Sequence, residues 1–236
     1  MKSITLGILV CTLCVLHGGC ASIGSKFDNK ESASSLNTKA DQDDANEYRK
    51  AAEQGNADAQ YNLGLCYEVG SGVPKDEVEA VKWYRKAADQ GYVEAQSYLG
   101  DCYANANGVK KDEVEAVKWY RKAAEQGNAE AQYNLGFCYS IGSGVPRDAE
   151  KSLNWGRKAV KGYRKVAKHG NTAAQIGLGG CYAFAVGVPE DKVEAYAFYN
   201  LSDSRKSTDR MAKEMTPEQI AAAKKRTKEL EKEFKK

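Results

Sequence analysis

Three stretches of the chain are nearly identical and stand 36 residues apart. Gly55, Gly91 and Gly127 hold the same place in them, within AAEQGNADAQYNLGLCY, AADQGYVEAQSYLGDCY and AAEQGNAEAQYNLGFCY. A unit of this length cannot bury its own apolar face, so successive copies have to stack on one another to form a continuous core. The sequence therefore predicts a solenoid, a fold that offers a long surface and no enclosed pocket.

The apolar positions within each copy follow the period of an α-helix. Ala59, Leu63 and Cys66 share one face of a first helix. Tyr84 and Ala88 share one face of a second helix. Each unit is therefore predicted to be a helical hairpin, and the expected fold class is all-α.

Capping and turn residues recur at the same places in each unit. Asn56 is suited to cap a first helix, and Asp76 with Glu79 forms a capping-box-like pair at the start of a second helix. The sequence GSGVP at 70–74 and again at 142–146 favours a turn between the two helices. Glycine also occurs inside the first helices, where it lowers helix stability, so we expect close backbone approach between packed helices there. These glycines are Gly64, Gly100, Gly136 and Gly179.

Together these motifs resemble the Sel-one-like repeat, a relative of the tetratricopeptide repeat. The shared pattern is AxAQxxLGxxY, a GxGV-type turn and AxxWYRKAAxQG. In the third unit 43 residues rather than 36 separate Gly127 from Gly170, which predicts a second helix about two turns longer. The resemblance implies a right-handed α-α superhelix with a half unit at 46–56, units at 57–90, 93–126, 129–169 and 172–204, and C-terminal capping helices over 205–236.

The beginning of the chain has the pattern of an export signal. A lysine precedes the apolar run ITLGILVCTLCVL, which is too short to span a membrane, so residues 1–19 are predicted to be an export signal. The following HGGCAS resembles a bacterial lipobox, which implies lipidation of Cys20. Because His17 stands where an aliphatic residue is usual, ordinary signal-peptidase cleavage near Ala21 is the alternative. Residues 20–45 are polar and are predicted to form a flexible linker.

The composition favours neither nucleic acid binding nor catalysis. Charged residues make up 28% of the chain and the formal net charge is only +3, so nothing requires an anionic partner. His169 is the single histidine outside the predicted export signal, and it precedes a helix-ending glycine. That position favours a cation at a helix C-terminus over a catalytic role. No catalytic residue and no cofactor are predicted.

Four cysteines occupy one repeated position, each directly before a tyrosine. They are Cys66, Cys102, Cys138 and Cys181. Neighbouring equivalents in stacked hairpins should lie too far apart for a disulfide, which needs Cα atoms within about 7 Å. We therefore expect buried thiols and no disulfide, and the same spacing argues against a metal site.

The inner surface of the array is the predicted binding surface. In tetratricopeptide-like arrays the first helix of each hairpin lines a concave groove, and the resemblance transfers this role to the matching positions here. Tyrosine offers area with a polar end and asparagine can hold a peptide backbone, so both suit recognition. The alternative is that Tyr61 and Tyr133 pack against the adjacent unit. The predicted partner-binding residues are Tyr61, Asn62, Leu65, Ser97, Tyr98, Asp101, Tyr133, Asn134, Phe137 and Ile176.

Two functions of different classes remain. The first is a non-catalytic scaffold or adaptor of the cell envelope that binds a protein or peptide partner in the groove. The second is an envelope hydrolase or cell-wall-binding factor, because some cysteine-rich relatives have been linked to penicillin binding or lactam hydrolysis. The chain lacks the Ser-x-x-Lys context and a second cysteine per unit, which favours the scaffold.

The predicted location follows from the export pattern. We expect a periplasm-facing outer membrane lipoprotein that contacts the membrane only through a lipid at Cys20. A soluble periplasmic or secreted protein is the alternative.

Overall fold

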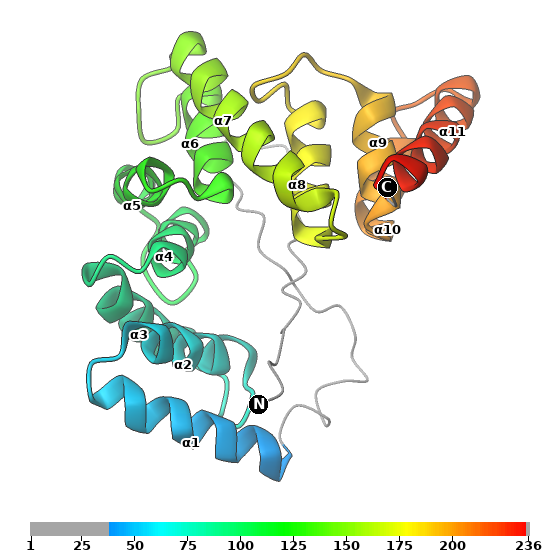
Figure 1. Ribbon diagram of the computed structural model, residues 1–236. Helices are drawn as coiled ribbons and strands as arrows, with labels where there is room; N and C mark the ends of the chain where they lie inside the picture. Colours follow the sequence, from blue (N-terminus) through cyan, green and yellow to red (C-terminus); the bar gives the residue numbers. More distant parts are fainter. Residues whose placement is uncertain (1–37, 235–236) are drawn as a thin grey trace.

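The computed structural model describes residues 38–234, and over that range the chain is built of helices without a strand (Figure 1). The helices of the array are α1 (Lys39–Glu53), α2 (Ala57–Val69), α3 (Glu77–Asp89), α4 (Val93–Asn105), α5 (Glu113–Glu125), α6 (Ala129–Ile141), α7 (Ala149–Ala167), α8 (Thr172–Ala183) and α9 (Lys192–Leu201). Two more follow, α10 (Arg205–Ala212) and α11 (Pro217–Phe234). The all-α prediction is confirmed.

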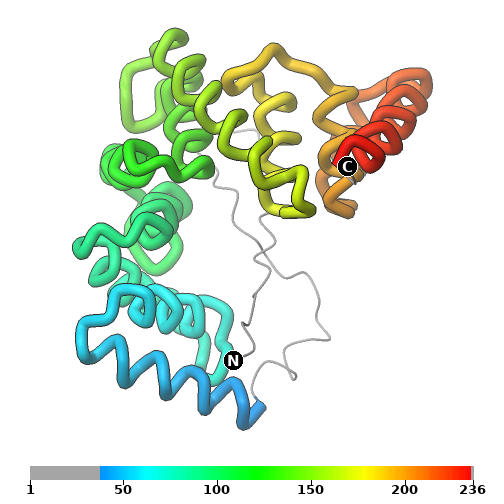
Figure 2. Tube along the Cα trace, in the orientation of Figure 1, coloured from blue at the N-terminus to red at the C-terminus, as the bar shows by residue number. Residues whose placement is uncertain are grey.

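Consecutive helices pack as hairpins. The pairs are α2 with α3, α4 with α5, α6 with α7 and α8 with α9, while α1 packs on α2 as a half unit. The helices follow a curved path from α1 past α5 to α8 and α11 (Figure 2). In Figure 1, α2 and α4 lie nearer the inside of this curve than α3 and α5. The first helix of these units is therefore the inner one.

The same two polar contacts join each unit to the next. A glutamine of the first helix donates to a carbonyl near the end of the preceding second helix, and an arginine of that preceding helix donates to a tyrosine hydroxyl. The glutamine contacts are Gln60–Ala52 (3.1 Å), Gln96–Ala88 (3.1 Å), Gln132–Ala124 (3.0 Å) and Gln175–Ala167 (3.1 Å). The arginine contacts are Arg49–Tyr67, Arg85–Tyr103, Arg121–Tyr139 and Arg164–Tyr182. Because the same bonds recur at each of these four junctions, they fix how one unit sits on the next.

The first helix begins before the predicted half unit. α1 starts at Lys39, so the boundary of the linker predicted at residue 45 falls inside the helix instead. Thr38 and Asp41 form a reciprocal capping box: Thr38 Oγ1 accepts from the Asp41 N–H at 3.2 Å, and Asp41 Oδ2 accepts from the Thr38 N–H at 2.8 Å. Ala45 is fully buried. The polar composition of this stretch indicated a linker, although its capping box defines the start of a helix.

The glycines inside the first helices make room for tyrosine rings. A Cβ atom at Gly64 would lie 2.6 Å from the ring of Tyr84, and one at Gly100 would lie 2.6 Å from the ring of Tyr120. Carbon atoms in contact normally stand about 3.5–4 Å apart, so no side chain fits there. Close approach is confirmed, but at these two positions the neighbour is a side chain rather than backbone.

The third unit departs from this pattern because its second helix is longer. α7 has 19 residues, against 13 in α3 and α5, as the spacing of the repeats predicted. Gly156 stands where the other units have the packing tyrosine, and there backbone does meet backbone. A Cβ atom at Gly156 would lie 2.3 Å from the backbone nitrogen of Gly187, in the turn between α8 and α9.

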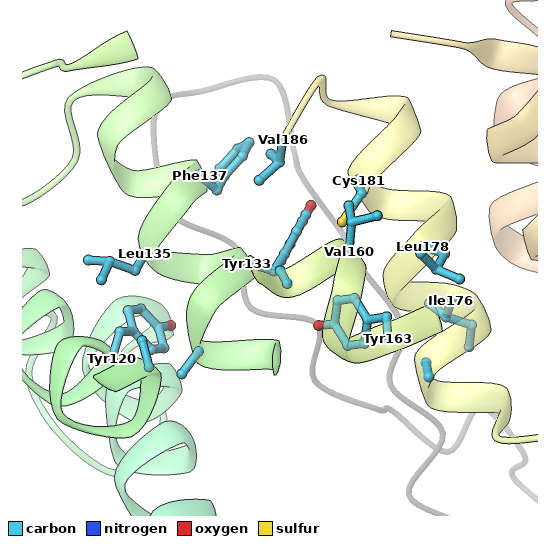
Figure 3. Packing of buried hydrophobic residues seen from close by; sticks show 14 of the residues in the cluster. Tyr120, Tyr133, Leu135, Phe137, Val160, Tyr163, Ile176, Leu178, Cys181 and Val186 are labelled. Carbon is cyan, nitrogen blue, oxygen red and sulfur yellow. The ribbon is translucent and has the colours of Figure 1, made fainter. Parts of the chain in front are cut away.

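The packing tyrosine reappears seven residues later in α7. A Cβ atom at Gly177 of α8 would lie 2.5 Å from the ring of Tyr163. Figure 3 shows the buried side chains at this joint, with Tyr133 of α6, Val160 of α7 and Cys181 of α8 lying close together. The core therefore continues from the third unit into the fourth despite the longer helix.

The last helix caps the array. Ala223 and Leu230 of α11 are buried and Ile220 is half-buried, which matches the predicted apolar stripe. Arg226 Nε donates to Glu194 Oε1 at 2.7 Å and ties α11 to α9. The outer face of α11 is polar, as the end of a stack requires.

Candidate functional site

Most of the predicted groove residues lie in the interior of the array. The buried ones are Tyr61, Ser97, Asp101, Tyr133, Asn134, Phe137 and Ile176, none more than 9% exposed. Asn62, Leu65 and Tyr98 are half-buried. The alternative stated for Tyr61 and Tyr133, packing against the adjacent unit, therefore describes these two residues better than partner contact.

Four tyrosine rings meet where the first two full units join. The ring centroid of Tyr61 lies 5.8 Å from that of Tyr84, 5.3 Å from that of Tyr92 and 5.5 Å from that of Tyr98. Aromatic pairs at such distances attract one another beyond their shared buried area. Burial raises the pKa of Tyr61 and of Tyr98, so both hydroxyls stay protonated. The cluster is a rigid aromatic surface.

Asp101 is a buried acceptor between the second and third units. The Tyr120 hydroxyl donates to Asp101 Oδ1 at 2.7 Å, and Asn134 Nδ2 donates to the same atom at 3.2 Å. Burial raises the pKa of Tyr120, which keeps that hydroxyl a donor. Asp101 and Asn134 thus hold units together.

Tyr133, Phe137 and Ile176 belong to the core between the third and fourth units (Figure 3). The rings of Tyr133 and Phe137 are stacked with centroids 6.3 Å apart, and Phe137 meets Phe184 edge-on at 5.8 Å. Ile176 has no exposed area. These three residues stabilise the packing between units and do not form part of the outer surface.

The accessible inner side chains gather beside the tyrosine cluster. We define the inner patch as Asp58, Asn62, Leu65, Tyr92 and Tyr98. The Tyr92 hydroxyl donates to Asp58 Oδ1 at 2.7 Å, and Asn62 Nδ2 donates to Asp58 Oδ2 at 3.2 Å. Leu65, Tyr92 and Tyr98 pack against one buried cluster, which holds them in place. The patch combines preorganised aromatic area with carboxylate and amide groups, the chemistry expected of a surface that binds peptide.

Two members of the inner patch, Asp58 and Tyr92, were missed by reasoning from the sequence. Tyr92 stands at the N-cap position of α4, where the equivalent helices α2 and α6 have Asn56 and Asn128. It makes no side-chain capping bond, although such a bond contributes about 1 kcal/mol. This departure from an otherwise near-identical repeat was the visible signal.

Glu130 differs from its counterparts in the earlier units. Asp58 and Glu94 hold the same repeat position and are exposed, whereas Glu130 is half-buried. The extra turns of α7 lie over the start of α6: a Cβ atom at Gly162 would stand 2.9 Å from the Cβ of Ala129. Burial raises the pKa of Glu130 to about 7. The lengthened helix has therefore created a carboxyl group that titrates near neutrality.

The repeated cysteines follow the prediction at three of four positions. Cys66, Cys102 and Cys181 are free and buried. Burial raises the pKa of the Cys66 thiol to about 11, so it is not a ready nucleophile. Cys138 is disulfide-bonded, which corrects the expectation of a free thiol there, and its partner is none of the other three. The distance argument concerned bonds between equivalent cysteines, and among residues 38–234 no such bond is found.

Little in the described part of the chain points to chemistry. His169 is exposed directly after the C-cap of α7, at the helix end where the sequence placed it. Residues 38–234 contain no group of three or more metal-binding side chains. None of the helices in that range is both long and apolar enough to cross a bilayer. The predicted export signal and Cys20 lie outside the described residues.

The comparison with protein families decides the assignment of the repeats. The Sel1 repeat model matches residues 48–56, 57–92, 93–128, 129–162 and 172–202. The chain belongs to the Sel1 repeat family. Sel1 repeats generally mediate protein–protein interaction, and proteins built from them are typically non-catalytic scaffolds. No curated protein matches this Sel1 repeat chain.

One solved structure supports the fold, and a second is similar in sequence. The chain is 34% identical to c5321, a protective antigen present in uropathogenic Escherichia coli strains that displays an SLR fold, with a TM-score of 0.55 over 80% of this chain and 41% of that one. It is also 43% identical to a Sel1 repeat protein from Oxalobacter formigenes, with a TM-score of 0.46 over 68% of this chain and 63% of that one. The Sel1 repeat chain thus spans less than two thirds of either protein.

Proposed function

We propose that this chain is a non-catalytic scaffold that binds a protein or peptide partner at the inner patch. The observation that supports this most is the set of half-buried aromatic and amide side chains at one joint, held by contacts within the array. A preorganised surface loses little side-chain entropy when a partner binds. The patch is also the more accessible part of the inner face, since most other predicted groove residues are buried between units.

We further propose that the protein acts in the cell envelope. The support is the pattern of residues 1–19 together with the lipobox-like stretch around Cys20. The similar c5321 is a protective antigen, which fits a protein located outside the cytoplasm. Intact-mass measurement of the protein purified from membranes tests this: a diacylglyceryl group at Cys20 supports it, and an unmodified product that begins elsewhere contradicts lipidation.

Replacing Asn62 and Tyr98 together by alanine is expected to abolish most partner capture without unfolding the array. Each half-buried side chain contributes contact area, and losses of about tenfold in affinity per residue are common for anchors of this kind. The measurement is crosslinking capture from native envelopes read by mass spectrometry, followed by titration of the purified partner.

The matched control for this pair is Asn154→Ala on the outer helix α7, where the side chain is exposed. Circular dichroism must show equal helix content for all variants. If the double variant captures the same partner as strongly as the control does, the inner patch is not the binding surface.

A further inference from the structure

The long second helix of the third unit, α7, carries an excess of positive charge that the other repeats lack. Within Ala149–Ala167 six lysines and arginines stand against one acidic residue, Glu150. The equivalent helices α3 and α5 each hold three basic and three acidic residues, so their charges cancel. Because the formal net charge of the whole chain is only +3, the excess of +5 on α7 leaves the rest of the chain slightly negative.

The seven additional residues of the third unit account for this excess. α3 contains one Arg-Lys pair, at 85–86, whereas α7 contains two, at 157–158 and 164–165. Lys161 is likewise followed by Lys168 seven residues later. Seven residues make almost two turns of helix, so the second copy of each cation lies farther along the same face as the first.

The duplicated cations form one stripe on the solvent side of α7. The buried residues of this helix, among them Ala159, Val160 and Tyr163, lie on its other side. At 1.5 Å per residue the stripe extends for about 17 Å along the helix. We define the basic stripe as six exposed residues: Arg157, Lys158, Lys161, Arg164, Lys165 and Lys168.

Acidic side chains do not neutralise the basic stripe. Arg164 donates to the Tyr182 hydroxyl at 2.7 Å, and Lys158 Nζ lies 4.1 Å from the centroid of the Trp155 ring, so both keep their charge. The side chains of the other four members form no ion pair or hydrogen bond within the described part of the chain. Lys161 has like charges three and four residues away on both sides, a spacing that destabilises a helix.

The helix dipole accounts for only half of the stripe. Cations in the last turn of a helix interact favourably with its C-terminus, which suits the last three members. Arg157, Lys158 and Lys161 lie more than one turn from that end, where the effect has faded. Their position therefore favours an anionic partner outside the chain.

The make-up of the stripe fits a lipid surface better than an acidic protein or a nucleic acid. Protein interfaces have aromatic anchors near their centre, and single-stranded nucleic acids stack on exposed aromatic rings. The basic stripe contains no aromatic residue, and the ring of Trp155 is half-buried. About four to eight lysines and arginines on an amphipathic helix are typical of attraction to anionic headgroups, which requires no matched pocket.

We propose that the basic stripe of α7 binds the phosphate groups of an anionic phospholipid surface. The proposal goes beyond the inner patch, with which the stripe shares no residue. It also does not require a lipid at Cys20, because the attraction comes from α7 alone. Where such a lipid is present, the stripe would hold one side of the array against the membrane.

Vesicle cosedimentation tests the proposal. The full chain would carry Cys20→Ser, so that a lipid anchor cannot contribute. Vesicles of phosphatidylcholine alone are compared with vesicles that also contain phosphatidylglycerol. We expect binding that requires phosphatidylglycerol and weakens as salt is added, because salt screens exposed charges. Equal binding to the two kinds of vesicle, or binding to neither, overturns the proposal.

Two soluble polyanions represent the other classes of partner. A DNA duplex and polyglutamate would be titrated with the same protein at the same salt concentration. We expect both to bind more weakly than the vesicles with phosphatidylglycerol. Tighter binding of either one would make α7 a surface for nucleic acid or for acidic protein, and the proposal would be wrong.

Variants of the stripe test whether α7 is the place of contact. Lys161→Gln combined with Lys165→Gln is expected to weaken binding to the anionic vesicles about fivefold for each cation removed. Loss of like charges at this spacing does not destabilise a helix, so circular dichroism should show unchanged helix content. Lys161→Arg combined with Lys165→Arg keeps the charge and should keep the binding.

The matched control removes the same charge from another helix. Lys224→Gln combined with Lys228→Gln changes two exposed positions of α11, where acidic residues are interspersed. Its binding should stay close to that of the unaltered chain. Equal weakening in the control and in the glutamine variant of α7, or no weakening in the α7 variant, contradicts the assignment to the basic stripe.

Discussion

Replacing Gly156 by alanine is expected to destabilise the protein by about 3 kcal/mol. The new methyl group would lie 2.3 Å from the backbone nitrogen and 2.6 Å from the Cα of Gly187. Backbone cannot rotate out of the way as a flexible side chain can, so α7 and the turn between α8 and α9 would have to separate. Alanine is the better helix former by about 1 kcal/mol, so a net loss would show that packing outweighs propensity here.

The measurement is urea unfolding followed by circular dichroism. Asn154→Ala is the control, because it lies on the same helix with an exposed side chain. A Gly156→Ala protein as stable as the control would mean that the two backbones do not touch. Because Gly156 joins the third and fourth units, we also expect the variant to unfold in two steps rather than one.

Replacing Glu130 by glutamine is expected to stabilise the protein by about 2 kcal/mol at pH 8 and to have almost no effect at pH 4. The folded state raises the pKa of Glu130 from its ordinary value of 4.5 to about 7, so the folded protein holds the proton more tightly than the unfolded chain does. The contribution of this group is therefore fully present below about pH 4.5 and is lost as the pH rises through 7. Glutamine does not ionise, so the variant does not lose this stability as the pH rises.

Glu94→Gln is the matched control, because Glu94 holds the same position in the second unit and is exposed. Stability of the three proteins would be compared by urea unfolding at several pH values. An equal gain in stability for Glu94→Gln, or a gain for Glu130→Gln that does not change with pH, would show that burial under α7 does not raise the pKa of Glu130.

The hairpins could be predicted from the sequence because their signals are local. Apolar period, N-cap residues and turn glycines all lie within about 36 residues of one another, and three near-identical copies repeat them. The longer α7 followed from the spacing of Gly127 and Gly170 for the same reason. The start of α1 was missed because its capping box, Thr38 with Asp41, lies in a stretch whose polar composition indicated a linker.

The binding surface was harder to predict because it depends on how units overlap. The period of a helix tells which side faces its hairpin partner, but Tyr61 is buried by Tyr92 and Tyr98 of the next unit. Glu94 and Glu130 sit in nearly the same local sequence and still differ in exposure. The difference comes from an insertion in another helix, which no local pattern records.

The recurring glutamine and arginine bonds between units have a consequence for how such a chain can change. At each junction from the half unit to the fourth unit, the earlier unit offers a carbonyl and an arginine, and the later unit offers a glutamine and a tyrosine hydroxyl. A duplicated or deleted copy would meet surfaces that already fit it, so the rod can lengthen or shorten by whole modules while its two ends stay intact. The junction between the third and fourth units carries the same two bonds and adds the backbone contact of Gly156 with Gly187, so it is less interchangeable than the others and divides the array into an extendable portion and a fixed terminus.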